Sequence, residues 1–70
     1  MTLDRDDFAV LVKAVRHQLK ISQEDLANAL GVSFATVNRW ENAKTTPSRL
    51  ARRQFDGFCT KMTQAGRLSL

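Results

Sequence analysis

Residues 23–42, QEDLANALGVSFATVNRWEN, limit what this chain can fold into more than any other stretch. Apolar residues recur there at the spacing of an α-helix on both sides of a single glycine: Leu26, Ala27, Leu30, Val37 and Trp40. Ser22 and Ser33 each stand where an N-cap would begin a helix. Gly31 can turn the chain in the left-handed conformation without a Cβ clash. Two capped helices that meet at a glycine corner predict a helix-turn-helix.

A further amphipathic helix is expected before this motif. It spans about residues 5–19, with Asp4 as its N-cap. Its apolar stripe follows the i, i+3, i+4, i+7 rule: Phe8, Leu11, Val12, Val15 and Leu19. The two helices of the motif are expected over about residues 23–30 and 34–42.

A fourth helix is expected after the motif. Pro47 suits the first turn of a helix, and Thr46 is placed to be its N-cap. We expect the apolar side of this helix to carry Leu50, Ala51, Phe55, Phe58, Cys59 and Met62. The other side is expected to carry Arg49, Arg52, Arg53 and Asp56. Four helical patterns and no strand pattern predict an all-α fold.

Charge is unevenly distributed along the chain, which at 70 residues is long enough for one small domain. Residues 1–38 carry four Lys or Arg and five acidic residues, whereas residues 39–70 carry seven Lys or Arg and two acidic residues. The excess of positive charge, +4 in total, begins at the end of the second motif helix. A basic balance of this kind favours a polyanionic partner, either nucleic acid or an anionic membrane surface.

The cellular setting is suggested by three features. Cys59 is the only cysteine, which excludes an intrachain disulfide and fits a reducing compartment. No apolar run reaches the roughly 18 residues of a membrane span. The first seven residues carry a net negative charge, with three Asp and one Arg, whereas a signal peptide would be basic and then apolar. We therefore expect a cytoplasmic protein.

The motif resembles the helix-turn-helix of the phage repressor and Cro family, also called the XRE family. Four positions carry the family pattern: Gln23, Ala27, Gly31 and Val37. The run Glu41-Asn42-Ala43-Lys44, followed by Pro47, resembles the run Glu-Asn-Gly-Lys and then Pro that ends the family's motif. Ala43 stands where the family usually has a glycine, at a position that often needs positive φ.

The resemblance covers roughly residues 8–58 and implies a compact λ-repressor-like domain of four to five helices. We place this DNA-binding domain at residues 1–62 and a C-terminal tail, which could serve in dimerisation, at residues 63–70. Relatives generally close the core with a fifth helix, and we expect this chain to lack a full one.

The unburied residues of the second motif helix are the candidates for reading DNA. If Val37 and Trp40 enter the core, the outward residues are Ser33, Phe34, Ala35, Asn38, Arg39 and Asn42. Arg39 can donate a fork to guanine, and Asn38 could pair with adenine. The resemblance implies that Ser33, Phe34, Ala35 and Arg39 are the base readers, ahead of Asn38. Alternatively, Phe34 folds back onto a neighbouring helix, Arg39 contacts only phosphate, and Ser33 is only a cap.

The resemblance also implies contacts with the DNA backbone by Gln23, Asn42, Lys44 and Thr45. Arg49, Arg52 and Arg53 either extend this clamp or form a solvated face. A structural ion pair between Arg16 and Glu41 is a further implication, against the simpler reading that Arg16 is solvated.

These observations predict sequence-specific binding of double-stranded DNA by a transcriptional regulator, a repressor that acts as a dimer on a pseudo-palindromic operator. The fourth helix and the tail are the candidate interface. Phe55, Phe58, Met62, Leu68 and Leu70 either build that interface or complete the core. One alternative is a protein-interaction module that also binds DNA, such as an antitoxin with a toxin partner or part of a modification system. Another is non-specific binding of single strands, which the scarcity of aromatics for stacking disfavours.

Enzymatic chemistry has little basis in this sequence. There is no glycine-rich phosphate loop, no pair of catalytic carboxylates and no metal-ligand spacing. His17 is the sole histidine, and Cys59 is expected to be a buried, inert thiol. We expect no enzyme, no cofactor and no metal.

Overall fold

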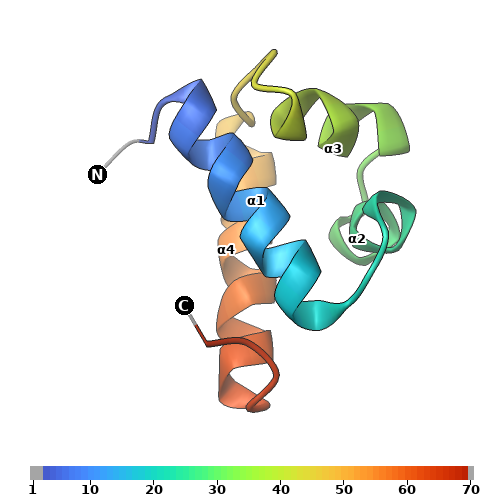
Figure 1. Ribbon diagram of the computed structural model, residues 1–70, viewed down its shortest axis with the longest axis vertical. Helices are drawn as coiled ribbons and strands as arrows, with labels where there is room; N and C mark the ends of the chain where they lie inside the picture. The colour runs from blue at the N-terminus through green and yellow to red at the C-terminus, as the bar shows by residue number, and fades with distance from the viewer. Residues whose placement is uncertain (1–2, 70) are drawn as a thin grey trace.

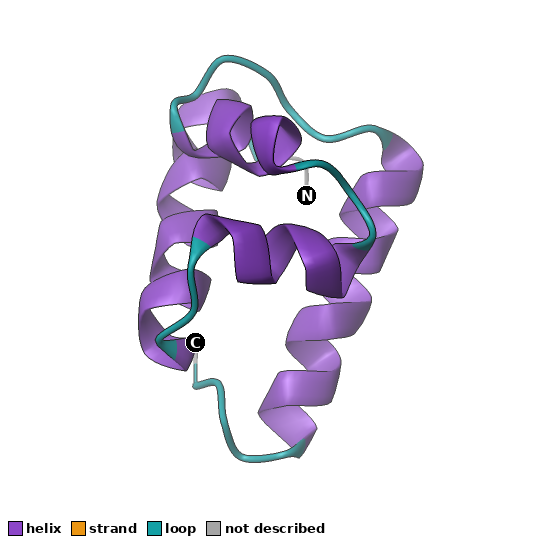
Figure 2. Ribbon diagram, turned by 90° about the vertical axis from the view of Figure 1, so that its right-hand side faces the viewer, coloured by secondary structure: helices purple, strands orange, loops and turns teal. Residues whose placement is uncertain are grey.

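The computed structural model describes residues 3–69, and within them the chain is all-α. The four helices are α1 (Arg5–Leu19), α2 (Gln23–Leu30), α3 (Phe34–Glu41) and α4 (Arg49–Gln64). α1 and α4 run along the long axis of the molecule, and α2 and α3 lie across them on one side (Figures 1 and 2). The bounds of α1 and α2 agree with the sequence prediction, and α3 ends one residue earlier than expected.

Each helix begins at an N-cap whose side-chain oxygen accepts a backbone N–H three residues later. These caps are Asp4, Ser22, Ser33 and Ser48. At α2 the cap is a complete capping box, because the Asp25 carboxylate also accepts the backbone N–H of Ser22. α2 ends at Gly31 with φ of 74°, the left-handed corner that the glycine predicted.

The start of α4 corrects the sequence prediction that Thr46 is its N-cap and that Pro47 lies in its first turn. Ser48 is the cap, and its Oγ accepts the N–H of Ala51 at 3.2 Å. A hydroxyl two residues further along the chain thus satisfies the first turn. Pro47 remains outside the helix and is half-buried at the groove between α1 and α4.

The core joins all four helices and the segment that follows α4. Its buried members are Phe8, Val12, Val15, Leu19, Leu26, Ala27, Leu30, Val37, Trp40, Phe55 and Leu68. Phe8 lies at the centre of an aromatic cluster, with its ring centroid 5.5 Å from Trp40 and 5.3 Å from Phe55. Both pairs are edge-to-face, the arrangement that aromatic quadrupoles favour. Trp40 is only 2% exposed, and its ring contact with Phe8 fixes α3 to α1. Phe8 in turn joins this pair to Phe55 of α4.

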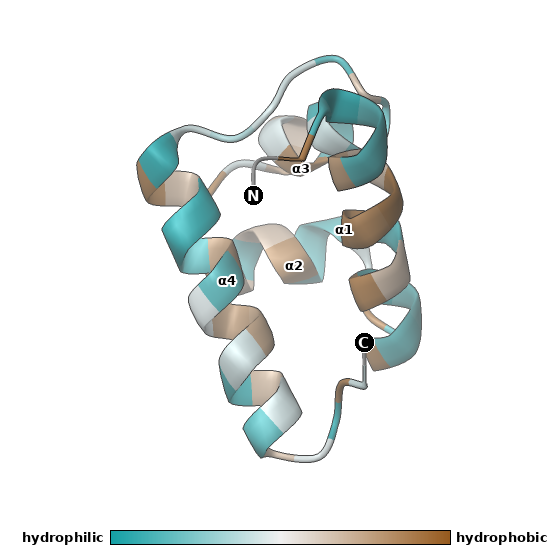
Figure 3. Cartoon of the chain, turned by 90° about the vertical axis from the view of Figure 1, so that its left-hand side faces the viewer, coloured by the Kyte–Doolittle hydropathy of each residue, from teal (hydrophilic) through white to brown (hydrophobic). Residues whose placement is uncertain are grey.

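The apolar side of α4 is narrower than the sequence predicted. Leu50, which was expected on it, is 67% exposed. Phe55 sets the phase of the helix because it is the residue of α4 that is fully buried, and Leu50 lies about 140° from it around the axis. Most residues in the first half of α4 are hydrophilic (Figure 3).

The segment after α4 returns to α1. Gly66, with φ of 74°, turns the chain, and Leu68 is buried in the core. The backbone of Ser69 donates to and accepts from the side-chain amide of Gln18, with both distances 2.9 Å. The sequence left open whether the apolar residues of this region form a dimer interface or complete the core. Phe55 and Leu68 are buried and complete the core. Leu70 lies outside the described residues.

None of the described helices is both long and apolar enough to span a bilayer.

Ala43 gives a direct test of the loop after α3, because it holds a positive φ of 56°. A non-glycine residue pays about 1 kcal/mol for this conformation. We therefore expect Ala43→Gly to raise the free energy of unfolding by about 0.5–1 kcal/mol, or the Tm by about 4 °C. Urea and thermal unfolding measure this difference.

Ala65→Gly is the matched control, since Ala65 caps α4 with an ordinary φ of −79°. Glycine relieves no backbone strain there and adds conformational freedom to the unfolded chain, so the free energy of unfolding should fall or stay level. A destabilised Ala43→Gly variant would show that the loop does not need the left-handed conformation.

Candidate nucleic-acid interface

The outer edge of α3 is exposed while its inner edge is buried. Val37 and Trp40 are in the core, whereas Phe34, Ala35 and Arg39 face solvent. Phe34 is 53% exposed, so it does not fold back to be covered by a neighbouring helix. The Arg39 side chain makes no hydrogen bond or ion pair with any described residue, which leaves its guanidinium free for a ligand. Three of the predicted base readers therefore share one accessible edge.

Ser33 is engaged locally as the cap of α3. Its Oγ accepts the backbone N–H of Thr36 at 3.1 Å and lies 2.8 Å from the Thr36 hydroxyl. The side chain is exposed, so a contact with DNA would be added to this capping role.

Asn38 differs from the expectation that it points freely outward. It is half-buried, its Nδ2 donates to Oε1 of Gln23 at 3.2 Å, and its Oδ1 accepts from Nδ2 of Asn42 at 3.0 Å. The first turn of α2 lies close enough for the Gln23 amide to cover this part of α3. A base contact by Asn38 would have to use its remaining N–H or break one of these bonds.

Gln23 is also half-buried, with its amide committed inside the protein. Besides accepting from Asn38, it donates through Nε2 to Oε1 of Glu41 at 3.1 Å. A phosphate contact at this position would thus involve the backbone N–H at the start of α2 more readily than the side chain. The positive end of the α2 dipole favours an anion there.

Arg16 and Glu41 form a bidentate ion pair between α1 and α3. Nε of Arg16 lies 2.6 Å from Oε2 of Glu41, and its Nη2 donates to Oε1 at 2.8 Å. Nη1 donates to the backbone oxygen of Ile21 at 3.2 Å, which links the connection between α1 and α2 to the same side chain. The two side chains are 17% and 4% exposed, so the pair is largely removed from water.

Glu41 stays ionised because of these partners. Burial by itself disfavours its charged form and would raise its pKa. Hydrogen bonds from Arg16 and Gln23, together with the charges of Arg16 and Lys13, outweigh burial and lower the pKa. The hydrogen bond to Glu41 in turn raises the pKa of Arg16 against the opposing effect of burial.

One continuous polar chain therefore links α1, α2 and the outer end of α3. It runs through Arg16, Glu41, Gln23, Asn38 and Asn42. The sequence predicted its first pair but not the link through the Gln23 amide. The i, i+4 spacing of Asn38 and Asn42 was a usable signal for the last link.

The loop after α3 carries the other predicted backbone contacts, Asn42, Lys44 and Thr45, all exposed. Arg5, which sequence reasoning did not single out, donates from Nη1 to the backbone oxygen of Lys44 at 3.4 Å. The first turn of α1 thus adds a positive charge beside this loop. On α4, Arg52 is half-buried and paired with Asp56, whereas Arg49 and Arg53 are exposed.

The side chains with potential for enzymatic chemistry lie apart from this interface. Burial, followed by the charge of Asp56, raises the pKa of the half-buried Cys59 thiol to about 11 against the opposing charge of Arg52. The thiol is therefore protonated near neutral pH and is a poor nucleophile. His17 is exposed on α1.

The fold and this exposed helix edge define a helix-turn-helix domain of the DNA-binding class. Comparison with known families gives the same answer, because a helix-turn-helix family model, HTH_3, matches residues 12–50. The chain belongs to this family, the XRE or Cro-like helix-turn-helix proteins.

One curated protein matches part of the chain. It is the Type II methyltransferase M1.ScrFI of Lactococcus lactis subsp. cremoris, which is 38% identical over 47 residues. The match takes in 63% of this chain but only 12% of the methyltransferase. No solved structure matches the chain at a significant level.

The buried ion pair predicts a large difference between two acid-to-amide substitutions. Glu41→Gln should lower the free energy of unfolding by about 2 kcal/mol, because it removes a buried charge-assisted bond. Asp56→Asn, at the exposed Arg52–Asp56 pair, should cost less than about 1 kcal/mol. Arg16→Ala should cost about 3 kcal/mol because it leaves the Glu41 carboxylate buried without its partner. Urea unfolding near neutral pH measures all three.

Acid pH tests the same pair. The pKa of Glu41 is lower in the folded protein than the value of about 4.3 expected in the unfolded chain. Its contribution is therefore present above that value and is lost as the pH falls through the folded pKa. Glu41→Gln should unfold with a flatter pH dependence below about pH 5 than the unsubstituted chain. Equal losses for Glu41→Gln and Asp56→Asn, with parallel pH profiles, would contradict the structural role of the pair.

Proposed function

We propose that this chain binds double-stranded DNA in a sequence-specific manner, with α3 inserted in the major groove. The observation that carries this proposal is the free, exposed Arg39 on an edge of α3 whose opposite edge is buried through Trp40. A guanidinium in this position can donate two parallel hydrogen bonds to O6 and N7 of one guanine. Such a pair contributes about 1–3 kcal/mol of discrimination against other bases.

The start of α3 would complete the reading surface. Phe34 and Ala35 offer apolar atoms that can pack on thymine methyl groups. Ser33 can contact a base or phosphate in addition to capping the helix. Asn38 acts in this proposal mainly through Gln23, by holding the start of α2 against α3, with base contact as its secondary role.

Contacts with the DNA backbone would lie on both sides of α3. On one side the first turn of α2 presents the backbone N–H of Gln23, and on the other the loop presents Asn42, Lys44 and Thr45. These contacts orient the domain without reading sequence. The excess of positive charge after residue 38 supports this arrangement.

A dimer that regulates transcription, as a repressor on a pseudo-palindromic operator, is the form of the function that we favour. One α3 reaches only a few base pairs, and two copies with recognition helices roughly 34 Å apart would double the site. Half-buried Phe58 and Met62 border a hollow of about 180 Å³ between α2, α4 and the end of α1, which supports this region as the interface.

A second candidate is a DNA-binding module of a modification system, with its effect dependent on another protein. The partial similarity to a Type II methyltransferase favours it over a toxin–antitoxin role. The two candidates share the α3 interface. They differ in whether the chain alone occupies a specific site and controls transcription.

Selection of bound sites from random duplex DNA, at a fixed salt concentration, tests the proposal. We expect a defined motif with at least one preferred guanine, and two-fold symmetry if the chain dimerises. Arg39→Ala should relax the preference for that guanine and cost about 1–3 kcal/mol at the preferred site. Lys44→Ala should weaken binding to all duplexes alike and reduce the slope of log K against log salt concentration by about one unit.

Lys61→Ala is the control, because it removes the same charge from an exposed position near the far end of α4. It should leave the motif and its affinity nearly unchanged. Recovery of no motif, an unaltered motif with Arg39→Ala, or preference for single strands would refute the proposed function.

A further inference from the structure

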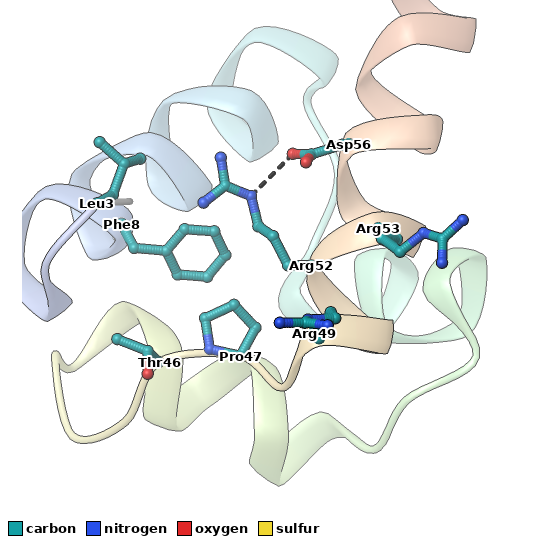
Figure 4. Close-up of a pocket in the computed structure, with 8 residues that line it drawn as sticks. All are labelled: Leu3, Phe8, Thr46, Pro47, Arg49, Arg52, Arg53 and Asp56. Carbon is teal, nitrogen blue, oxygen red and sulfur yellow. Dashed lines mark hydrogen bonds and ion pairs between the residues drawn. The ribbon is translucent and has the colours of Figure 1, made fainter. Parts of the chain in front are cut away.

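A second charged surface lies between the start of α1 and the start of α4. It is a groove of about 400 Å³, a volume in the range of protein binding sites (Figure 4). Its lining residues are Leu3, Phe8, Thr46, Pro47, Arg49, Arg52, Arg53 and Asp56. None of them belongs to α2 or α3, so the groove is separate from the edge of α3 assigned to DNA.

Arginine dominates the charge of this groove, with three guanidinium groups and one carboxylate among the lining residues. Arg52 is held in place, because its Nε donates to Asp56 at 2.8 Å and its guanidinium carbon lies 5.2 Å from the Phe8 ring centroid. Its two terminal nitrogens make no hydrogen bond with the described residues. Arg49 and Arg53 are exposed and likewise have no acidic partner there. The groove therefore has several unused donors beside one fixed cation.

The floor of the groove is apolar. Leu3 and Pro47 are half-buried on either side of Phe8, and the Arg52 guanidinium lies over the ring (Figure 4). A ligand that fills this space gains most if it carries an apolar group next to anionic oxygens. The deoxyribose rings of a phosphodiester backbone are less apolar than a Leu or Phe side chain, so such a backbone would fill this floor less well.

We propose that this groove docks an acidic segment of a partner protein, in which one or two apolar side chains are flanked by carboxylates. An apolar side chain lies against Leu3 and Pro47, and the carboxylates accept from Arg49 and the terminal nitrogens of Arg52. Arg53 adds charge at the rim. Because the groove lies apart from α3, the segment can be held while the domain is on DNA.

NMR titration of the ¹⁵N-labelled chain with the peptide Asp-Glu-Leu-Phe-Asp-Glu, acetylated and amidated at its ends, tests this proposal. We expect saturable shifts of the amides at Thr46, Arg49 and Arg52, with a Kd of about 100 μM as for a small interface. The amide counterpart Asn-Gln-Leu-Phe-Asn-Gln should bind at least about tenfold more weakly. Asp-Glu-Ser-Ser-Asp-Glu should bind about fivefold more weakly because it lacks the apolar group.

Two variants separate the groove from general attraction to positive charge. Arg49→Ala should weaken binding of the acidic peptide about fivefold. Lys61→Ala, which removes the same charge from the same helix outside the groove, should leave its affinity within about twofold. Both variants should select the same DNA motif as the unsubstituted chain.

Four results would overturn the proposal. The first is the absence of shifts at millimolar peptide, and the second is equal binding of the acidic and amide peptides. The third is competition by duplex DNA together with a uniform loss of DNA affinity in Arg49→Ala, which would assign the groove to phosphate. The fourth is a loss of self-association in that variant, measured by sedimentation, which would assign it to a second copy. The DNA-site selection is independent of these readouts, so failure here leaves the proposed function standing.

Discussion

The ion pair between Arg16 and Glu41 is the interaction on which the exposed surface of α3 depends. α3 has eight residues, too few for a helix to be stable by itself in water. Its orientation therefore comes from tertiary contacts: Trp40 packs in the aromatic cluster, and Glu41 is ion-paired with Arg16 of α1. These neighbouring residues fix the helix about its axis, which leaves Arg39 on the solvent side.

The same contacts extend outward through polar groups rather than ending in the core. Glu41 accepts from Gln23, and Gln23 accepts from Asn38, so the start of α2 and the middle of α3 are held at a set distance. A rigid frame of this kind lowers the conformational entropy that binding would otherwise cost. The groove between α1 and α4 adjoins the aromatic cluster, because Phe8 belongs to both.

Sequence reasoning succeeded at most of the features that local interactions decide, the exception being the N-cap of α4, which is Ser48 rather than Thr46. The N-caps Ser22 and Ser33, the glycine corner and the apolar periodicity placed α1, α2 and α3 closely, and the family pattern predicted the positive φ of Ala43. It failed where distant residues decide. The phase of α4 is set by Phe55 in the aromatic cluster, which exposes Leu50. The bond between Gln23 and Asn38 joins segments that no local pattern relates. The sequence left Leu68 open between the core and a dimer interface, and its burial places it in the core.

The central claim is that the outer edge of α3 meets a DNA duplex while its inner edge stays in the core. An NMR titration of the labelled chain with its selected duplex measures both edges at once. The account predicts the largest shifts at Phe34, Ala35 and Arg39, with the buried Val37 amide, which donates to the backbone oxygen of Ser33, still protected from exchange with water. Shifts concentrated on α4 with α3 unchanged, or rapid exchange of the Val37 amide, would contradict it.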